Sequence, residues 1–210
     1  MSQLEQHLDH YSAQLEQLKQ QGNLRQFTSN IQHGRTIQIN GQSMLNLSSN
    51  DYLGLASDLH LREQFFDQTP NDLRIMSSSS SRLLTGNFPA YEQLEASLSQ
   101  VFYGRSALLF NSGYHMNIGI LPALSDARTL ILADKLIHAS MIDGIRLSSA
   151  KYVRYRHNDL NHLSQLLQKY HADESFDRII VVTESIFSMD GDETDLAELV
   201  RIKQQFSKVM

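Results

Sequence analysis

The spacing of apolar residues divides the chain into helical and extended segments. Near the start, apolar residues recur every three or four positions, which predicts an amphipathic helix with one narrow stripe: Leu4, Leu8, Tyr11, Leu15 and Leu18. Gly22 is expected to end this helix. A stripe so narrow, on a segment rich in Gln, is typical of an arm that packs over a domain or a partner subunit.

Two short alternating runs follow and predict a β-hairpin. Residues 36–39 and 43–47 alternate apolar with polar positions, and Asn40-Gly41 between them is the strongest short signal for a two-residue turn. We therefore expect residues 1–47 to form an arm of helix and hairpin. Residues 48–210 are expected to form the main domain.

From residue 91 onward, helix-length segments alternate with short apolar runs. The expected helices cover 91–102, 114–124, 138–147, 158–170 and 196–206. The expected strands cover 106–110, 129–133, 152–155 and 178–183. Helical connections between consecutive strands require parallel pairing. The fold class is thus α/β, with a mostly parallel sheet and helices on both faces.

The composition narrows the classes of function. With 18 Lys+Arg against 23 Asp+Glu, the formal charge is −5, which disfavours unspecific binding to nucleic acid. The absence of Cys excludes disulfides, cysteine nucleophiles and thiolate metal sites, and it suits a reducing cytoplasm, where we expect the protein. No export signal and no apolar run of bilayer-spanning length is visible, so we expect no membrane insertion.

Ligands bind beyond the carboxyl ends of parallel strands, so the strand-to-helix turns are candidate sites. In Asn111-Ser-Gly-Tyr114, Gly113 would let a ligand approach the backbone, and the first amides of the helix would bind a phosphate. A plain cap and turn explains the same residues equally well. In the turn 134–140, His138 could stack on a flat cofactor or move a proton. A histidine at a helix start that is bonded to backbone is the favoured alternative.

Two more segments carry candidate chemistry. In 183–192, Ser188 could hydrogen-bond a cofactor oxygen, whereas Asp190-Gly191-Asp192 is expected only to shape the turn. The serine run 77–81 with the following residues 82–87 is either a linker or a ligand loop, and composition does not distinguish the two. The histidines lack the companion ligands of a zinc site, so no metal is expected.

Five segments, taken in order, resemble the α-oxoamine synthases: 47–55, 81–87, 110–114, 134–140 and 183–192. The resemblance implies an incomplete large domain of the aspartate-aminotransferase type (fold type I), pyridoxal 5'-phosphate as cofactor, and a homodimer. The nearest branch of this family condenses L-alanine with a pimeloyl thioester, of coenzyme A or acyl carrier protein, to give 8-amino-7-oxononanoate in biotin biosynthesis. Glycine C-acetyltransferase and 5-aminolevulinate synthase share these motifs and remain alternatives.

The resemblance also implies roles for individual residues. The backbone amides of Gly113 and Tyr114 would hold the cofactor phosphate, and Ser188 would bond the phenolic oxygen of the ring. His138 would stack on the pyridine ring and help to orient the amino-acid carboxylate. Arg25 would meet the acyl substrate, and Asn50 would line the substrate site.

This chain differs from the family in having no lysine that matches the Schiff-base motif. Pyridoxal-phosphate enzymes use a lysine for the resting Schiff base and an acid against the pyridine nitrogen. The family supplies both from segments that follow those matched here. None of the lysines of this chain matches the motif: Lys19, Lys135, Lys151, Lys169, Lys203 and Lys208. We therefore expect roughly the N-terminal half of such an enzyme, inactive by itself. A non-catalytic folding or association unit is the alternative for this chain.

Overall fold

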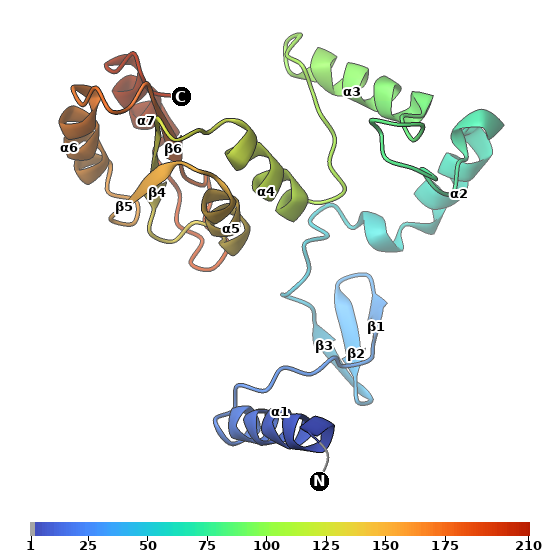
Figure 1. Cartoon of the computed structure of the whole chain (residues 1–210). Helices are drawn as coiled ribbons and strands as arrows, with labels where there is room; N and C mark the ends of the chain where they lie inside the picture. Colours follow the sequence, from blue (N-terminus) through green and yellow to red (C-terminus); the bar gives the residue numbers. More distant parts are fainter. Residues whose placement is uncertain (1–2) are drawn as a thin grey trace. The chain divides into compact units, whose positions relative to one another are not determined.

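The computed structural model describes residues 3–210, and its contacts divide the chain into two compact units after Ala90. The first unit begins with α1 (Gln3–Gln20), which confirms the expected helix (Figure 1). Gly22 follows it in the left-handed region, at φ +69°. The stripe residues from Leu8 to Leu18 are exposed, and the side chain of Leu4 lies outside the described part. Nothing within this unit covers the stripe of described residues.

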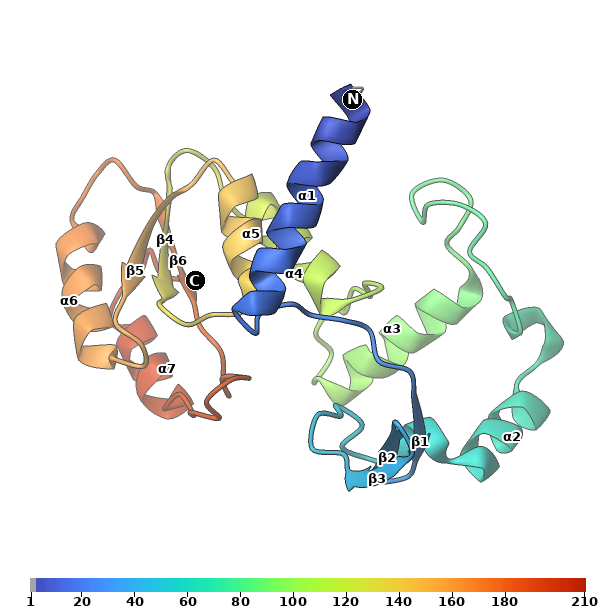
Figure 2. The same cartoon turned by 90° about the horizontal axis from the view of Figure 1, so that it is seen from below.

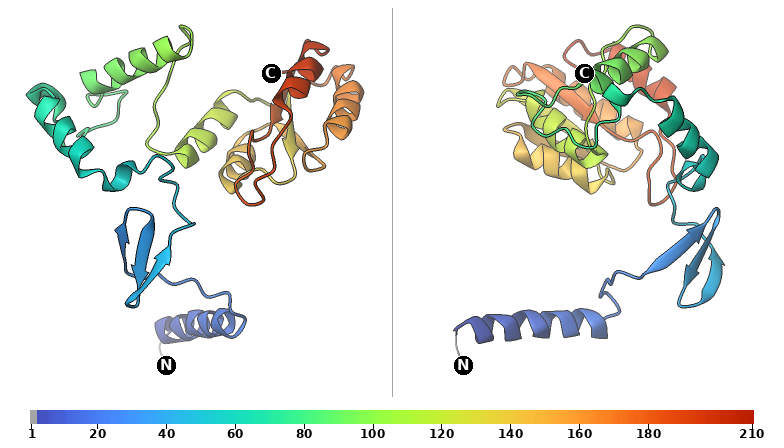
Figure 3. Two further views of the ribbon diagram at one scale, coloured as in Figure 1. Left: turned by 180° about the vertical axis from the view of Figure 1, so that it is seen from behind. Right: turned by 90° about the vertical axis from the view of Figure 1, so that its right-hand side faces the viewer.

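A small antiparallel sheet follows, with strands β1 (Asn30–His33), β2 (Thr36–Ile39) and β3 (Gln42–Leu45) in that order (Figure 3). The hairpin between β2 and β3 is confirmed. Asn40 and Gly41 take φ values of 51° and 77°, as a two-residue turn with a primed geometry requires. Strand β1 was not predicted. Its four residues, Asn-Ile-Gln-His, include a single apolar position, so the sequence offers no alternation to detect.

The rest of the first unit is made of short helices. Two 3-10 turns, η1 (Leu55–Ser57) and η2 (Asn71–Leu73), flank α2 (Leu59–Gln68). The carboxylate of Asp58 caps α2 by accepting the N–H of Leu61 at 2.9 Å. None of these three elements buries a residue. The next helix, α3 (Pro89–Val101), confirms the expected helix near 91–102.

The second unit is built on a parallel sheet in the order β5-β4-β6. Its strands are β4 (Thr129–Asp134), β5 (Lys151–Tyr155) and β6 (Arg178–Val182), close to the expected ranges. Every residue of β4 is buried because the strand has a neighbour on each side and helices on each face. This position explains the nearly continuous apolar sequence of β4.

Four helices cover the two faces of this sheet (Figures 1 and 2). On one face, α6 (Leu160–His171) and α7 (Leu196–Gln204) pack on β4 through a cluster that includes Leu130, Leu132, Leu163, Leu167 and Ile202. On the other face, α4 (Gly113–Ala123) and α5 (Ala139–Leu147) pack on β4 through a second cluster, which includes Leu121, Ile131, Ala133 and Ile145. The expected α/β fold with helices on both faces is confirmed.

The expected strand over 106–110 is wrong. These residues form no strand, and Leu108 remains 67% exposed. Among the described residues, Leu109 finds a side-chain acceptor for its N–H, the Glu95 carboxylate at 2.9 Å, in place of a neighbouring strand. An apolar run becomes a strand only where another strand accepts and donates its backbone hydrogen bonds.

The start of α6 also differs from the expectation. Asp159, not Asn158, is the N-cap, and its carboxylate accepts the N–H of His162 at 2.8 Å. Asn158 takes the left-handed φ of 50° and donates its side-chain amide to the carbonyl of Glu193 at 2.7 Å. The cap of α7 is Asp195, as expected.

Candidate functional site

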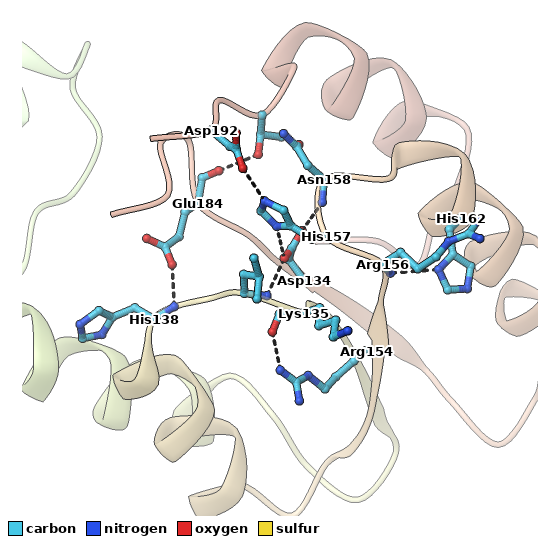
Figure 4. A network of polar contacts seen from close by, with 12 residues as sticks. Asp134, Lys135, His138, Arg154, Arg156, His157, Asn158, His162, Glu184 and Asp192 are labelled. Carbon is cyan, nitrogen blue, oxygen red and sulfur yellow. Dashed lines mark hydrogen bonds and ion pairs between the residues drawn. The ribbon is translucent and has the colours of Figure 1, made fainter. Parts of the chain in front are cut away.

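The parallel sheet places three turns at one edge. The carboxyl ends of β4, β5 and β6 point the same way because all three strands are parallel. The residues that follow them meet there in a network of polar contacts (Figure 4). This is the edge at which parallel α/β sheets bind their ligands.

The N-terminus of α4 is suited to an anion. The Ser112 hydroxyl caps the helix by accepting the N–H of His115 at 3.2 Å. Among the described residues, no acceptor satisfies the N–H groups of Gly113 and Tyr114, as is usual for a first helical turn. A Cβ added at Gly113 would meet nothing within 4 Å. The backbone is therefore open to a phosphate here, and the residues fit the phosphate group of pyridoxal phosphate.

Contacts between α4 and α5 hold this turn in place. The side-chain amide of Asn117 donates to the buried hydroxyl of Ser140 at 2.9 Å, and the hydroxyl of Tyr114 donates to Asp143 at 3.0 Å. The bond to the Asp143 carboxylate raises the pKa of the Tyr114 hydroxyl. Gly144 lies under α4 so closely that an added Cβ would overlap the carbonyl oxygen of Asn117. The first turn of α4 is thus tied to the first turns of α5.

His138 stands at the start of α5, where its ring and its backbone N–H both make polar contacts. Its ring Nδ1 accepts the N–H of Ser140 at 3.2 Å and lies 2.7 Å from the hydroxyl of the same residue. Its backbone N–H donates to the carboxylate of Glu184 at 2.6 Å. The ring therefore caps the helix, as the alternative interpretation expected. The residue is also exposed, so the ring leaves a surface on which a flat ligand can stack.

The segment after β6 folds back on itself. The N–H of Phe187 donates to the carbonyl of Asp192, and the N–H of Gly191 donates to the carbonyl of Phe187, both at 2.9 Å. Gly191 takes a φ of +74°, which favours glycine. The structural role expected for Asp190-Gly191-Asp192 is confirmed. Ser188 lies exposed in this turn.

His157 joins two carboxylates at the centre of this edge. Its Nδ1 lies 2.9 Å from Asp134 Oδ1, and its Nε2 lies 3.0 Å from Asp192 Oδ2 (Figure 4). The hydrogen bond to Asp134, and to a smaller extent the one to Asp192, raises the pKa of the imidazole. Sequence reasoning missed this arrangement. The one signal for it is an aspartate that ends an otherwise apolar, fully buried strand.

Two buried hydroxyls lie at the same end of the sheet. Tyr155 ends β5 opposite Asp134, and Thr183 follows β6 directly. Within the part of the chain that the structure covers, neither hydroxyl has a hydrogen bond of good geometry, although the Thr183 hydroxyl is near enough to the Tyr155 phenol to act on its pKa. Burial raises the pKa of Tyr155 to about 12, so the phenol is neutral at physiological pH.

The remaining predicted site residues belong to the first unit. Arg25 is exposed, and Asn50 is exposed with its side-chain oxygen 3.5 Å from the hydroxyl of Tyr52. The second unit thus carries Gly113, Tyr114, His138 and Ser188, but not these two.

Metal and membrane sites are absent from the described residues. Among the described side chains, those of residues 8–210, no three His, Asp or Glu gather as a metal site. None of the helices described there is long and apolar enough to cross a bilayer.

Comparison with known sequences identifies close relatives. The family model for class I and II aminotransferases matches residues 42–209. A protein of Pasteurella multocida (strain Pm70) is 58% identical over 201 residues, which cover 96% of this chain and 51% of the relative. A protein of Neisseria meningitidis (strain MC58) is 57% identical over 196 residues, covering 93% and 51%. Both carry the name "Putative 8-amino-7-oxononanoate synthase". The chain spans about half the length of these relatives.

Solved structures share the fold. Serine palmitoyltransferase from S. paucimobilis, with a bound PLP-myriocin aldimine, matches with a TM-score of 0.79 and 25% identity over 100% of this chain and 52% of its own. The 8-amino-7-oxononanoate synthase of Francisella tularensis matches with a TM-score of 0.52 and 30% identity over 74% and 41%. The first match extends over the whole of the present chain.

Proposed function

Because the chain belongs to the class I and II aminotransferase family, as an α-oxoamine synthase with a partial fold-type I pyridoxal-phosphate domain, we propose that it serves the synthesis of 8-amino-7-oxononanoate. The reaction condenses L-alanine with a pimeloyl thioester, of coenzyme A or acyl carrier protein, and releases carbon dioxide in biotin biosynthesis. The names of the close relatives support this product. We further propose a cytoplasmic homodimer.

The observation that carries the proposal is the open N-terminus of α4 beside α5. A phosphate there would accept the N–H groups of Gly113 and Tyr114 and gain from the positive end of the helix dipole. The exposed ring of His138 would stack on the pyridine ring, and the exposed hydroxyl of Ser188 would bond its phenolic oxygen. Residues from α4, α5 and the segment after β6 would then hold one flat, phosphorylated ligand.

The cofactor, when bound, supplies an electron sink for breaking the bond to the carboxylate of the amino acid. His138 would orient that carboxylate, while Arg25 would meet the acyl substrate and Asn50 would line its site. None of the six lysines matches the attachment motif of the family. We therefore propose that this chain binds the cofactor but does not turn over substrate by itself.

Titration of the chain with pyridoxal 5'-phosphate, followed by absorbance, tests the binding site. We expect saturable binding that inorganic phosphate weakens, with affinity reduced about tenfold in Ser188→Ala by the loss of one hydrogen bond to a charged group. Ser175→Ala is the matched control because this serine is exposed and precedes β6, and among the described residues its hydroxyl bonds only Asp173. Equal affinities of the Ser188→Ala protein, the Ser175→Ala protein and the wild type would contradict the assignment of Ser188.

The reaction is tested in a chimaera of this chain and the following half of the Pasteurella multocida relative. We expect release of thiol from a pimeloyl thioester with L-alanine, and a decrease of roughly 30-fold to 1000-fold in His138→Ala. Its melting temperature should fall by only about 2–4 °C, through loss of the cap of α5. A chimaera that uses glycine with an acetyl or succinyl thioester, but not L-alanine, would assign the chain to a sibling activity. A folded chimaera that binds no pyridoxal phosphate would refute the proposal.

A further inference from the structure

The carboxylates of Asp134 and Asp192 favour one protonation state of the His157 ring. Both ring nitrogens lie within 3.0 Å of carboxylate oxygens, one from Asp134 and one from Asp192. An imidazole donates from both nitrogens only when it carries two protons. The two carboxylates therefore favour the imidazolium form of the ring, in which both contacts are charge-assisted hydrogen bonds and stronger than neutral ones.

One end of this bridge is fixed to the sheet. Asp134 is fully buried, and its carboxylate also accepts the N–H groups of Leu136 at 2.8 Å and Asn158 at 2.7 Å. These bonds satisfy both oxygens and hold the carboxylate at the end of β4. The Asp134 carboxylate, itself held by these two backbone N–H groups, therefore orients the ring of His157.

The other end is the segment Glu184–Thr194. His157 meets it at Asp192 and also at Phe187, whose ring lies edge-on at 4.5 Å between centroids. Phe187 is 2% exposed and directly precedes Ser188. The imidazole thus contacts the segment at the two residues that close its turn, next to the serine.

The same segment contacts the second candidate residue. The carboxylate of Glu184 accepts the backbone N–H of His138 at 2.6 Å, and the carbonyl of Glu184 accepts the hydroxyl of Thr194 at 2.7 Å. The two ends of the segment are therefore joined to each other and to the start of α5. A shift of the segment would change the position of Ser188 relative to His138.

From these contacts we infer that His157 is a positioning residue, which holds Glu184–Thr194 against the end of β4 and so sets where Ser188 stands. The inference rests on the proposed function, because Ser188 matters only if it meets the cofactor. It adds a residue that touches no ligand and acts through Phe187 and Asp192.

Two variants test the bridge without leaving Asp134 unpaired in the interior. Asp192→Ala removes the half-exposed acceptor and keeps the bond between His157 and Asp134. His157→Gln keeps one donating nitrogen in place of two, because the other end of the amide is a carbonyl oxygen, which can only accept. His162→Gln is the matched control, because this histidine accepts the N–H of Arg156 at 3.0 Å and, among the described residues, makes no hydrogen bond to the segment.

The first readout is amide hydrogen exchange in the 210-residue chain, without cofactor. We expect the N–H groups of Phe187, Gly191 and Thr194 to exchange about tenfold faster or more in Asp192→Ala and His157→Gln, as loss of a charge-assisted hydrogen bond implies. In the same variants, the exchange rates of the β4 N–H groups should stay within about twofold of wild type. In the His162→Gln protein, the exchange rates of the segment should also stay within about twofold of wild type. Wild-type exchange of the segment in both bridge variants would overturn the inference.

The second readout is affinity for pyridoxal 5'-phosphate, which a merely structural bridge would leave unchanged. We expect Asp192→Ala and Ser188→Ala both to lower the affinity, while only Asp192→Ala accelerates exchange of the segment. Faster exchange with wild-type affinity in Asp192→Ala, alongside weaker binding in Ser188→Ala, would overturn the positioning role. A wild-type chain that binds no pyridoxal phosphate would overturn the proposed function itself, whatever the exchange rates.

Discussion

Replacing Gly144 by Ala tests the contact that holds α4 on α5. Gly144 is buried within α5, and the backbone of Asn117 lies directly over it. A Cβ at position 144 would overlap the carbonyl oxygen of Asn117, and it would lie 3.0 Å from the carbonyl carbon and 3.1 Å from Leu121 Cδ1. The nearest obstacle is backbone, which cannot rotate away as a side chain can. The helices must therefore separate to admit one methyl group.

Two opposing free energies set the size of the effect. Alanine in a helix interior is more favourable than glycine by about 1 kcal/mol. Forcing a methyl group into a packed contact costs roughly 1–3 kcal/mol, and the upper part of that range applies because backbone must move. We expect a net loss of about 1–2 kcal/mol in the free energy of unfolding. The displaced α4 should also bind pyridoxal phosphate less tightly, because its first turn carries the phosphate site.

The matched control is Gly119→Ala, on α4. An added Cβ there meets only Phe110 Cε1 at 3.5 Å, an ordinary contact distance. The same substitution should then stabilise the chain by about 0.5–1 kcal/mol, through helix propensity alone. Urea denaturation followed by circular dichroism measures both variants. If Gly144→Ala proves as stable as wild type while Gly119→Ala is stabilised, the close approach of α4 and α5 is refuted.

Three further predictions concern stability. Asp195→Ala removes the carboxylate that accepts the N–H of Glu198 at 2.9 Å, and it should lower the free energy of unfolding by about 1 kcal/mol, measured by urea denaturation. Leu163→Ala leaves a cavity in the fully buried core and should cost about 2–5 kcal/mol, measured as a lower melting temperature. Hydrogen bonds from Arg128 lower the pKa of Asp177, so the stability from this pair is present above about pH 4 and is lost as the pH falls through the lowered value. Melting curves at acidic pH should lose this dependence in Arg128→Met, and an unaltered dependence would contradict it.

The elements that sequence analysis predicted best are those with strong local signals. The helix near residues 4–18, the Asn40-Gly41 hairpin and the buried strand β4 each follow from the order of neighbouring residues alone. The run 106–110 shows the limit of this reasoning. Its composition is that of a buried strand, but strand formation depends on a partner that the residues themselves do not specify.

Some parts of the candidate site could also be predicted from local sequence, and others could not. The turns that carry Gly113, His138 and Ser188 are visible in the sequence because each follows a strand-like run and precedes a helix or a glycine turn. The bridge through His157 was missed because its partners lie 23 and 35 positions away along the chain. No periodicity connects such positions, so only the folded structure brings them together.

The strand order has a consequence for the way in which the chain folds. Strand β4 lies in the middle of the sheet, yet its two neighbours come after it, first β5 and then β6. During synthesis, β4 and β5 can pair as soon as both have left the ribosome. The second edge of β4 stays unpaired until residues 178–182 have also been made. In that interval an apolar strand presents unpaired backbone groups, the feature that recruits other chains into aggregates. We therefore expect a delay in the synthesis of β6 to favour association of chains over native folding.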